Sequence, residues 1–158
     1  MKFKVAPEPS GMDFLSDAQE ALPLVPSSEN DCCARLLDRT ELTARDDARE
    51  WITFLRALGL AEETSSGYRR LRRDPDREEL ATAFREGVFG VEALLDALDD
   101  EPLDEDELFD RFRSHVPNWE RYRRPDWESH WRGRVRRLLG WAVVFDLAER
   151  VGDEHRAV

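Results

Sequence analysis

The chain has 158 residues, of which 41% are apolar and 37% are charged, so it can bury a core but carries more charge than an average globular protein. Its 24 basic and 35 acidic side chains give a formal net charge of −11, which by itself argues against a polyanionic partner. The longest purely apolar stretch, residues 141–145, is far too short to cross a membrane, and no apolar signal core follows the first residues. We therefore expect a soluble, cytoplasmic protein with no membrane partner.

The first half predicts three helices and a hairpin. Helical spacing of apolar residues indicates a short amphipathic helix over 12–21. Ser28 is expected to cap a second helix and Thr43 a third, which Gly59 closes. Two short strands around Ser-Ser-Gly then predict a β-hairpin over 60–71.

The second half predicts a similar order of elements. Helices are expected at 77–84 and 89–98, and Asp104 with Glu107 at the capping-box position begins another. A loop over 118–125 leads into a long helix over 126–144, and a second hairpin ends the chain at 146–158. The tripeptide Leu-Ala-Glu occurs at the start of both hairpins, 87 residues apart, which indicates an internal repeat.

Three helices followed by a hairpin resemble a winged helix-turn-helix domain, and the stretch TARDDAREWITFLRALGLAEETSSGYRRLRR resembles the recognition helix and wing of that superfamily. The resemblance implies a mainly α fold with small β-hairpin wings, arranged as two winged-helix-like domains in tandem, 10–73 and 76–158. The alternative is one continuous helical bundle. The acid excess and the near-absence of lysine also resemble haloarchaeal proteins, among which a low pI does not exclude a nucleic-acid partner.

Charge is segregated along the chain. Residues 91–110 contain ten acids and no base, whereas four arginines fall within 69–73 and seven within 120–137. Two explanations stay open: the acidic segment neutralises the arginine segment inside one fold, or the arginine faces bind a polyanion.

The candidate nucleic-acid-binding residues lie on the two third helices and on the first wing. A winged helix that binds DNA places its third helix in the major groove and its wing on the backbone. The candidates are Arg45, Arg49 and Arg56 on the first of these helices, Tyr68, Arg69, Arg70, Arg72 and Arg73 on the wing, and Arg132, Arg136 and Arg137 on the second.

The expected strand and helix geometry indicates how these candidate residues are arranged. Strand alternation is expected to put Arg70 and Arg72 on one side of the wing and Arg69 and Arg73 on the other. Gly133 and Gly140 lie near Arg136 on the long helix and either allow a backbone, phosphate or helix to approach closely or mark bends. Arginines and aromatics in 119–125 suit single-stranded nucleic acid or cap a core.

No motif for catalysis, nucleotide binding or metal binding is present, so the sequence predicts a non-enzymatic protein without a metal or cofactor. The adjacent Cys32 and Cys33 are expected to place one thiol in the core and one near the surface. Two functions stay open. The first is a DNA-binding, transcription-regulator-like module; the second is a protein-interaction scaffold or homodimer that binds no nucleic acid.

Overall fold

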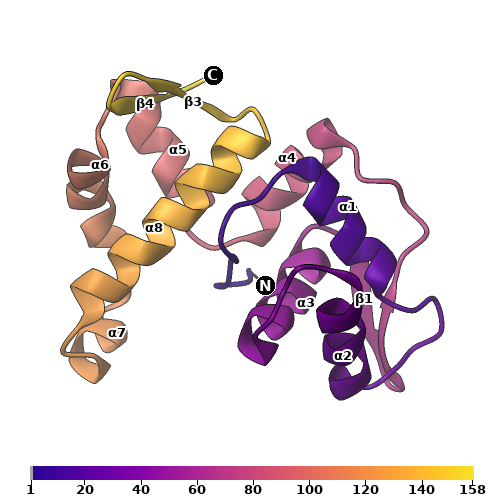
Figure 1. Cartoon of the computed structure of the whole chain (residues 1–158). Helices are drawn as coiled ribbons and strands as arrows, with labels where there is room; N and C mark the ends of the chain where they lie inside the picture. Colours follow the sequence, from indigo (N-terminus) through magenta and orange to yellow (C-terminus); the bar gives the residue numbers. More distant parts are fainter. Residues whose placement is uncertain (1) are drawn as a thin grey trace.

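The computed structural model describes residues 2–158 (Figure 1). Helices account for 57% of the chain and the strands form two small antiparallel hairpins, which confirms the predicted mainly α fold with β-hairpin wings. In chain order the elements are α1 (Met12–Ala21), α2 (Glu29–Arg39), α3 (Arg45–Ala57), β1 (Ala61–Thr64), β2 (Gly67–Arg70), α4 (Arg77–Gly87), α5 (Val91–Asp100), α6 (Glu105–Phe112), the 3-10 turn η1 (Arg113–His115), α7 (Asn118–Arg123), α8 (Trp127–Val144), β3 (Ala148–Val151) and β4 (Glu154–Ala157).

Side-chain caps fix several helix starts. The Ser28 hydroxyl accepts a hydrogen bond of 3.1 Å from a backbone N–H three residues on, which begins α2 as predicted. Asp104 and Glu107 form the reciprocal capping box at the start of α6. The predicted Thr43 cap is wrong, because the residue before α3 is Ala44, whose side chain makes no cap hydrogen bond.

One extended residue from outside the strands pairs with each hairpin. Ser27 and Tyr68 exchange backbone hydrogen bonds of 3.0 and 2.8 Å, and Leu103 and His155 exchange bonds of 2.9 and 2.8 Å. Ser27 lies just before α2 and Leu103 just before α6. The two halves therefore share one order: a helix, an extended residue, two further helices and a hairpin.

The spacing between equivalent features identifies what interrupts the repeat. Ser27 and Leu103 lie 76 residues apart, whereas the first residues of β1 and β3 lie 87 apart. The longer spacing arises because η1 and α7 are inserted between α6 and α8. The predicted loop over 118–125 is wrong in part, since α7 occupies most of it. The helix α4 has no counterpart in the first half.

Both third helices end in the same way. Gly59 has a φ of +75° and Asp146 a φ of +58°, and each is followed by a leucine whose N–H reaches back into the helix. Those bonds are 2.9 Å long from Leu60 to Leu55 and 2.8 Å long from Leu147 to Ala142. The 87-residue repeat seen in the sequence thus extends to backbone hydrogen bonding.

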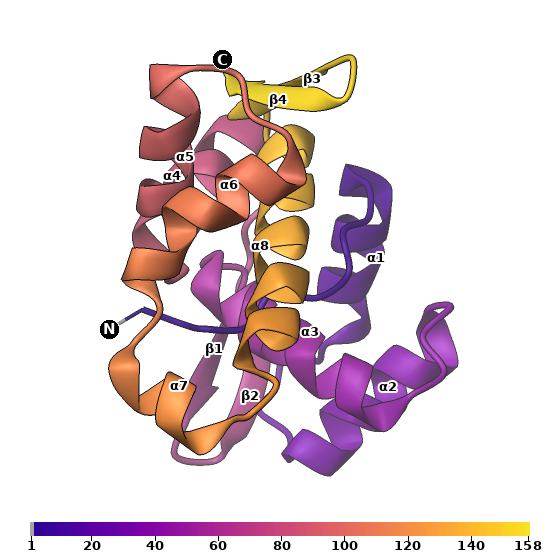
Figure 2. The same cartoon turned by 90° about the vertical axis from the view of Figure 1, so that its left-hand side faces the viewer.

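One hydrophobic cluster runs through both halves. Trp141 of α8 is fully buried and lies 5.6 Å from Trp51 and 4.7 Å from Phe54 of α3, measured between ring centroids. Phe84 of α4 lies between Phe54, at 6.2 Å, and Phe145, at 5.3 Å. In Figure 2, α8 stands between α5 and α6 on one side and α1 and α2 on the other. The boundaries 10–73 and 76–158 stay a prediction.

The N-terminal segment, residues 3–9, crosses this junction. Phe3 pairs in parallel with the end of α4, with its N–H 2.8 Å from the Gly87 carbonyl oxygen. The Trp141 indole N–H donates to the Pro7 carbonyl oxygen at 2.8 Å. A Cβ on Gly140 would lie 2.3 Å from the ring of Pro9, so this glycine does allow a close approach. At Gly133 a Cβ would meet nothing within 4 Å.

Cys32 and Cys33 are both fully buried in α2, so the expectation of one thiol near the surface is wrong. The Cys32 sulfur lies 3.7 Å from the Ser27 carbonyl oxygen, beside the point where the hairpin joins. Burial, helped by the neighbouring Cys33, raises the pKa of Cys32 to about 11. A thiol held protonated in this way is a poor nucleophile.

Candidate nucleic-acid interface

The arginines of the first wing differ in the groups that they contact. Arg69 on β2 faces Glu62 on β1, and its Nε donates to that carboxylate at 2.6 Å. Tyr68 is half-buried, with the Arg56 guanidinium 5.5 Å from its ring centroid. Burial and the Glu63 carboxylate raise the pKa of Tyr68. These side chains are held within the hairpin.

Arg70, Arg72 and Arg73 lie together on the other flank of the wing. They line a hollow of about 420 Å³ beside α1. The expected grouping of Arg73 with Arg69 is wrong, because β2 ends at Arg70 and the chain leaves strand geometry. Among residues 2–158 none of the three pairs with a carboxylate: Arg70 donates to the Glu20 carbonyl oxygen at 3.3 Å, and Arg73 to a backbone carbonyl.

A buried amide holds the backbone beneath these arginines. Gln19 of α1 is 5% exposed, and its Nε2 donates to the Leu71 carbonyl oxygen at 3.2 Å and to the Arg73 carbonyl oxygen at 2.7 Å. These two bonds fix the segment after β2 against α1. The backbone that carries these side chains is therefore held in place, with Arg72 and Arg73 exposed and Arg70 half-buried.

The arginines of α3 reach different neighbours. Arg49 pairs with Glu29 of α2 at 3.0 Å, and Arg56 pairs with Glu63 of β1 at 3.3 Å. Arg45 donates to the side chain of Asn30. From residue 50 to the end of α3 every residue is buried or half-buried, because the helix packs against α1, α2 and the second half. The exposed residues of α3 are therefore 45–47 and 49, all near its start.

The open face of α8 mixes both signs of charge. Arg132 pairs with Asp106 of α6 at 2.7 Å. Arg137 is shared between Glu8 at 3.2 Å and Glu50 at 3.5 Å. In the part of the chain that the structure describes, Arg136 forms no ion pair. It lines a hollow of about 610 Å³ whose acidic members are Glu8, Asp104, Glu105, Asp106 and Asp153 and whose basic members are Arg136, Arg150 and His155.

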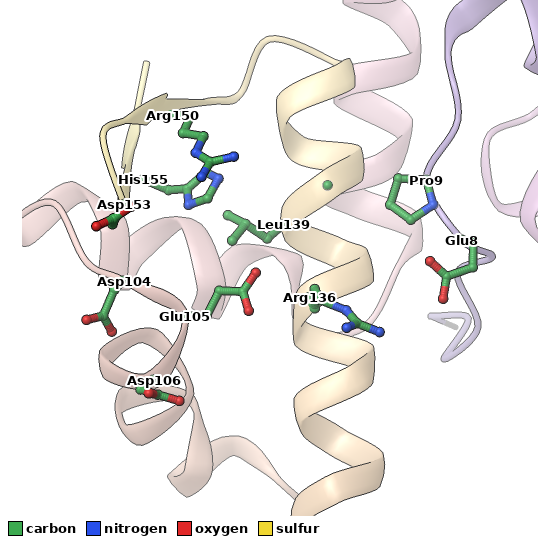
Figure 3. A pocket seen from close by; sticks show the side chains of 11 residues that line it. Glu8, Pro9, Asp104, Glu105, Asp106, Arg136, Leu139, Arg150, Asp153 and His155 are labelled. Carbon is green, nitrogen blue, oxygen red and sulfur yellow. The ribbon is translucent and has the colours of Figure 1, made fainter.

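Figure 3 shows how this hollow is arranged. Arg136 extends from α8 toward the segment that carries Glu8, while Glu105 approaches from α6 on the other side and His155 from the second hairpin. Burial and the charge of Arg150 lower the pKa of His155. The acid-rich lining makes this face a poor platform for a polyphosphate backbone.

Three basic residues outside the predicted set lie close to it. Lys4, His130 and Arg134 line a smaller cleft on the side of α8 that faces the N-terminal segment and Glu50. The helical pattern of α8 alone does not reveal this cleft, because it depends on where the N-terminal segment crosses. The exposed aromatics of α7 are Trp119 and Tyr122, 49% and 90% exposed.

A family model described as the halobacterial double winged helix domain matches residues 1–158. The chain belongs to this family. The match covers both halves, so the predicted tandem of winged helices and its haloarchaeal character are confirmed for this double winged helix domain.

No curated protein and no solved structure matches this halobacterial double winged helix domain. Within residues 2–158, no helix combines the length and apolar character needed to span a membrane. The same residues bring together no group of three or more histidine, cysteine or acidic side chains suited to a metal ion.

Proposed function

We propose that the protein binds double-stranded DNA as a transcription-regulator-like module. The winged-helix fold supports a DNA-binding or regulatory role. The observation that carries the proposal is the cluster of Arg70, Arg72 and Arg73, three guanidinium groups without a carboxylate partner on one rigid segment next to the first wing. Contacts through these groups are to phosphates and are independent of base sequence.

The other predicted residues take secondary parts in this proposal. Arg45 and Arg49 are exposed near the start of α3 and exchange their present partners for phosphates. Arg56, Tyr68 and Arg69 are held inside the first winged helix and orient the wing. We propose no catalytic step for the protein. We also propose that it is located in the cytoplasm.

Fluorescence anisotropy with labelled duplex DNA over a salt series tests the proposal. The affinity should fall as salt rises, and Arg72→Gln should reduce the slope of log K against log salt by about 0.9 if it removes one phosphate contact. Arg85→Gln is the matched control, because Arg85 already pairs with Glu92 at 3.1 Å on α4 and α5. Absence of binding at every salt concentration that keeps the protein folded would refute the proposal.

A second function is favoured by the charge pattern of α8. The Arg132–Asp106 ion pair and the acids around Arg136 suit a protein surface of mixed charge better than a phosphate backbone. We propose as the alternative that this face binds a protein partner, with a second copy of the chain as the first candidate. Light scattering tests it: the wild type should have twice the chain mass and Arg136→Glu the single mass. A wild type at the single-chain mass contradicts the homodimer.

A further inference from the structure

A basic cleft lies where the N-terminal segment crosses α8, away from the first wing. Its volume is about 260 Å³. The charged and titratable residues that line it are Lys4, His130, Arg134, Arg136, Arg137 and Glu50. Four permanent positive charges thus surround one carboxylate in a protein whose net charge is −11.

That carboxylate is already engaged. Glu50 lies 3.5 Å from Arg137, which also pairs with Glu8 at 3.2 Å. Burial raises the pKa of Glu50, and the positive charge of Arg137 opposes that rise. Keeping the Glu50 carboxylate ionised in the cleft therefore costs free energy. Among the described residues, Lys4, Arg134 and Arg136 pair with no carboxylate. Positive charge in the cleft therefore exceeds what the chain itself neutralises.

Two buried nitrogens of the lining residues have no hydrogen-bond partner. They are Nη1 of Arg134 and Nε2 of His130, for which residues 2–158 supply none. The Arg134 guanidinium lies 4.9 Å from the ring centroid of Trp131, which holds it in place. The buried Glu120 lies near, but it pairs with Arg124 at 3.8 Å. A buried polar nitrogen without a partner is destabilising, and a bound ion or water is one way to satisfy it.

We propose that this cleft binds a phosphate-class oxyanion. A tetrahedral dianion supplies several acceptor oxygens and two negative charges, which match the donors and the excess positive charge. The bound oxyanion joins Lys4 of the N-terminal segment to α8, and so ties the first residues of the chain to the second winged helix. The inference does not rest on DNA binding through the wing, because the cleft shares no residue with the Arg70–Arg73 cluster.

The test is a titration of the full chain with inorganic phosphate at constant ionic strength, with chloride as the replaced anion. Phosphate should raise the melting temperature in proportion to the logarithm of its concentration, and calorimetry should give one site per chain. Arg134→Gln and Lys4→Gln should each weaken phosphate binding by about tenfold or more. Arg85→Gln is the control, because Arg85 pairs with Glu92 at 3.1 Å outside the cleft, and this variant should bind phosphate as the wild type does.

Two readouts keep the result unambiguous. If Arg134→Gln does not fold, Lys4→Gln decides, because Lys4 is exposed and its ammonium contacts only the rings of Trp119 and Phe89 among the described residues. In the wild type, phosphate should shift the His130 imidazole resonances in NMR. Equal stabilisation by chloride and phosphate, or unchanged phosphate affinity in both variants, would overturn the proposal.

The source of the phosphate is settled by competition. Duplex DNA that displaces inorganic phosphate from the cleft identifies a backbone phosphate as the ligand, whereas phosphate that stays bound beside DNA identifies a free phosphate or phosphate ester. Either outcome supports the cleft as a phosphate site. A chain that binds phosphate but no DNA would refute the proposed DNA-binding function and leave the cleft in place.

Discussion

Replacing Trp141 tests whether the two winged helices unfold as one unit. Trp141→Phe removes the indole N–H that donates to the buried Pro7 carbonyl oxygen at 2.8 Å. Leaving that acceptor unpaired is expected to cost about 1–3 kcal/mol, and the lost ring volume adds about 1 kcal/mol at a site that is fully buried. The free energy of unfolding should therefore fall by about 2–4 kcal/mol.

The loss should appear in the whole chain at once. Because Trp141 packs against Trp51 and Phe54 of the first half, both halves should lose stability together. For a chain of this size the melting temperature should drop by about 5–15 °C. The assay is thermal and urea unfolding followed by far-UV circular dichroism and by tryptophan fluorescence, and the two probes should give one coincident transition.

Trp119→Phe is the matched control, since Trp119 of α7 is 49% exposed and its ring contacts the side chains of Lys4 and Arg123. Its stability should change by less than about 0.5 kcal/mol. Two separate transitions in the wild type, or a Trp141→Phe variant that loses only one of two transitions, would refute the single-unit reasoning.

Three further predictions concern buried groups and helix glycines. Because burial raises the pKa of Cys32 to about 11, Cys32 and Cys33 should not react with a thiol reagent at pH 8 until the protein is unfolded; fast labelling of the native state would contradict the burial. Burial lowers the pKa of His155 below the unfolded value of 6.5, so the unfolded chain takes up the proton first and stability should fall as pH drops below about 6.5. His155→Gln should flatten that fall between pH 7 and pH 5 in urea unfolding, and an unchanged slope would argue against it. Gly133→Ala should stabilise the protein by up to about 1 kcal/mol, because its Cβ meets nothing, whereas Gly140→Ala should destabilise it through Pro9; a reversed order in melting temperature would contradict the packing.

Local patterns predicted much of the fold. The caps at Ser28 and Asp104 and the two Leu-Ala-Glu sites depend on residues close in sequence, and each appears as expected. The predicted Thr43 cap was wrong because an N-cap residue stands directly before the helix. The helix α3 begins at Arg45, so that place belongs to Ala44. The short α7 was missed because six residues give too little periodicity for a helix to be recognised.

Tertiary packing was the part that local patterns could not supply. Trp141 of α8 is fully buried because α3 packs against it, and this contact joins helices far apart in the sequence. For the same reason α3 is covered from residue 50 onward, which no property of its own sequence indicates.

The arginines of the candidate site could be predicted from the sequence, but the groups that they contact could not. Which arginines are neutralised depends on contacts over long distances in sequence, such as Arg137 with Glu8 and Arg132 with Asp106. The sequence indicated that acidic and basic segments could neutralise each other, and at Arg132 they do. It could not indicate that Arg70, Arg72 and Arg73 would lie together without carboxylates.

The crossing of the N-terminal segment has a consequence for the order of folding during synthesis. The bond from Trp141 to Pro7 joins residues 134 positions apart, and that from Arg137 to Ala6 joins residues 131 apart. Residues 3–9 are made before α8, so the Ala6 and Pro7 carbonyl oxygens have no access to these donors until α8 has been made. Until then the Trp141 indole that packs against Trp51 and Phe54 is missing, so part of the apolar surface of α3 stays uncovered. A helix of the second half, α8, therefore completes the apolar packing of the first half.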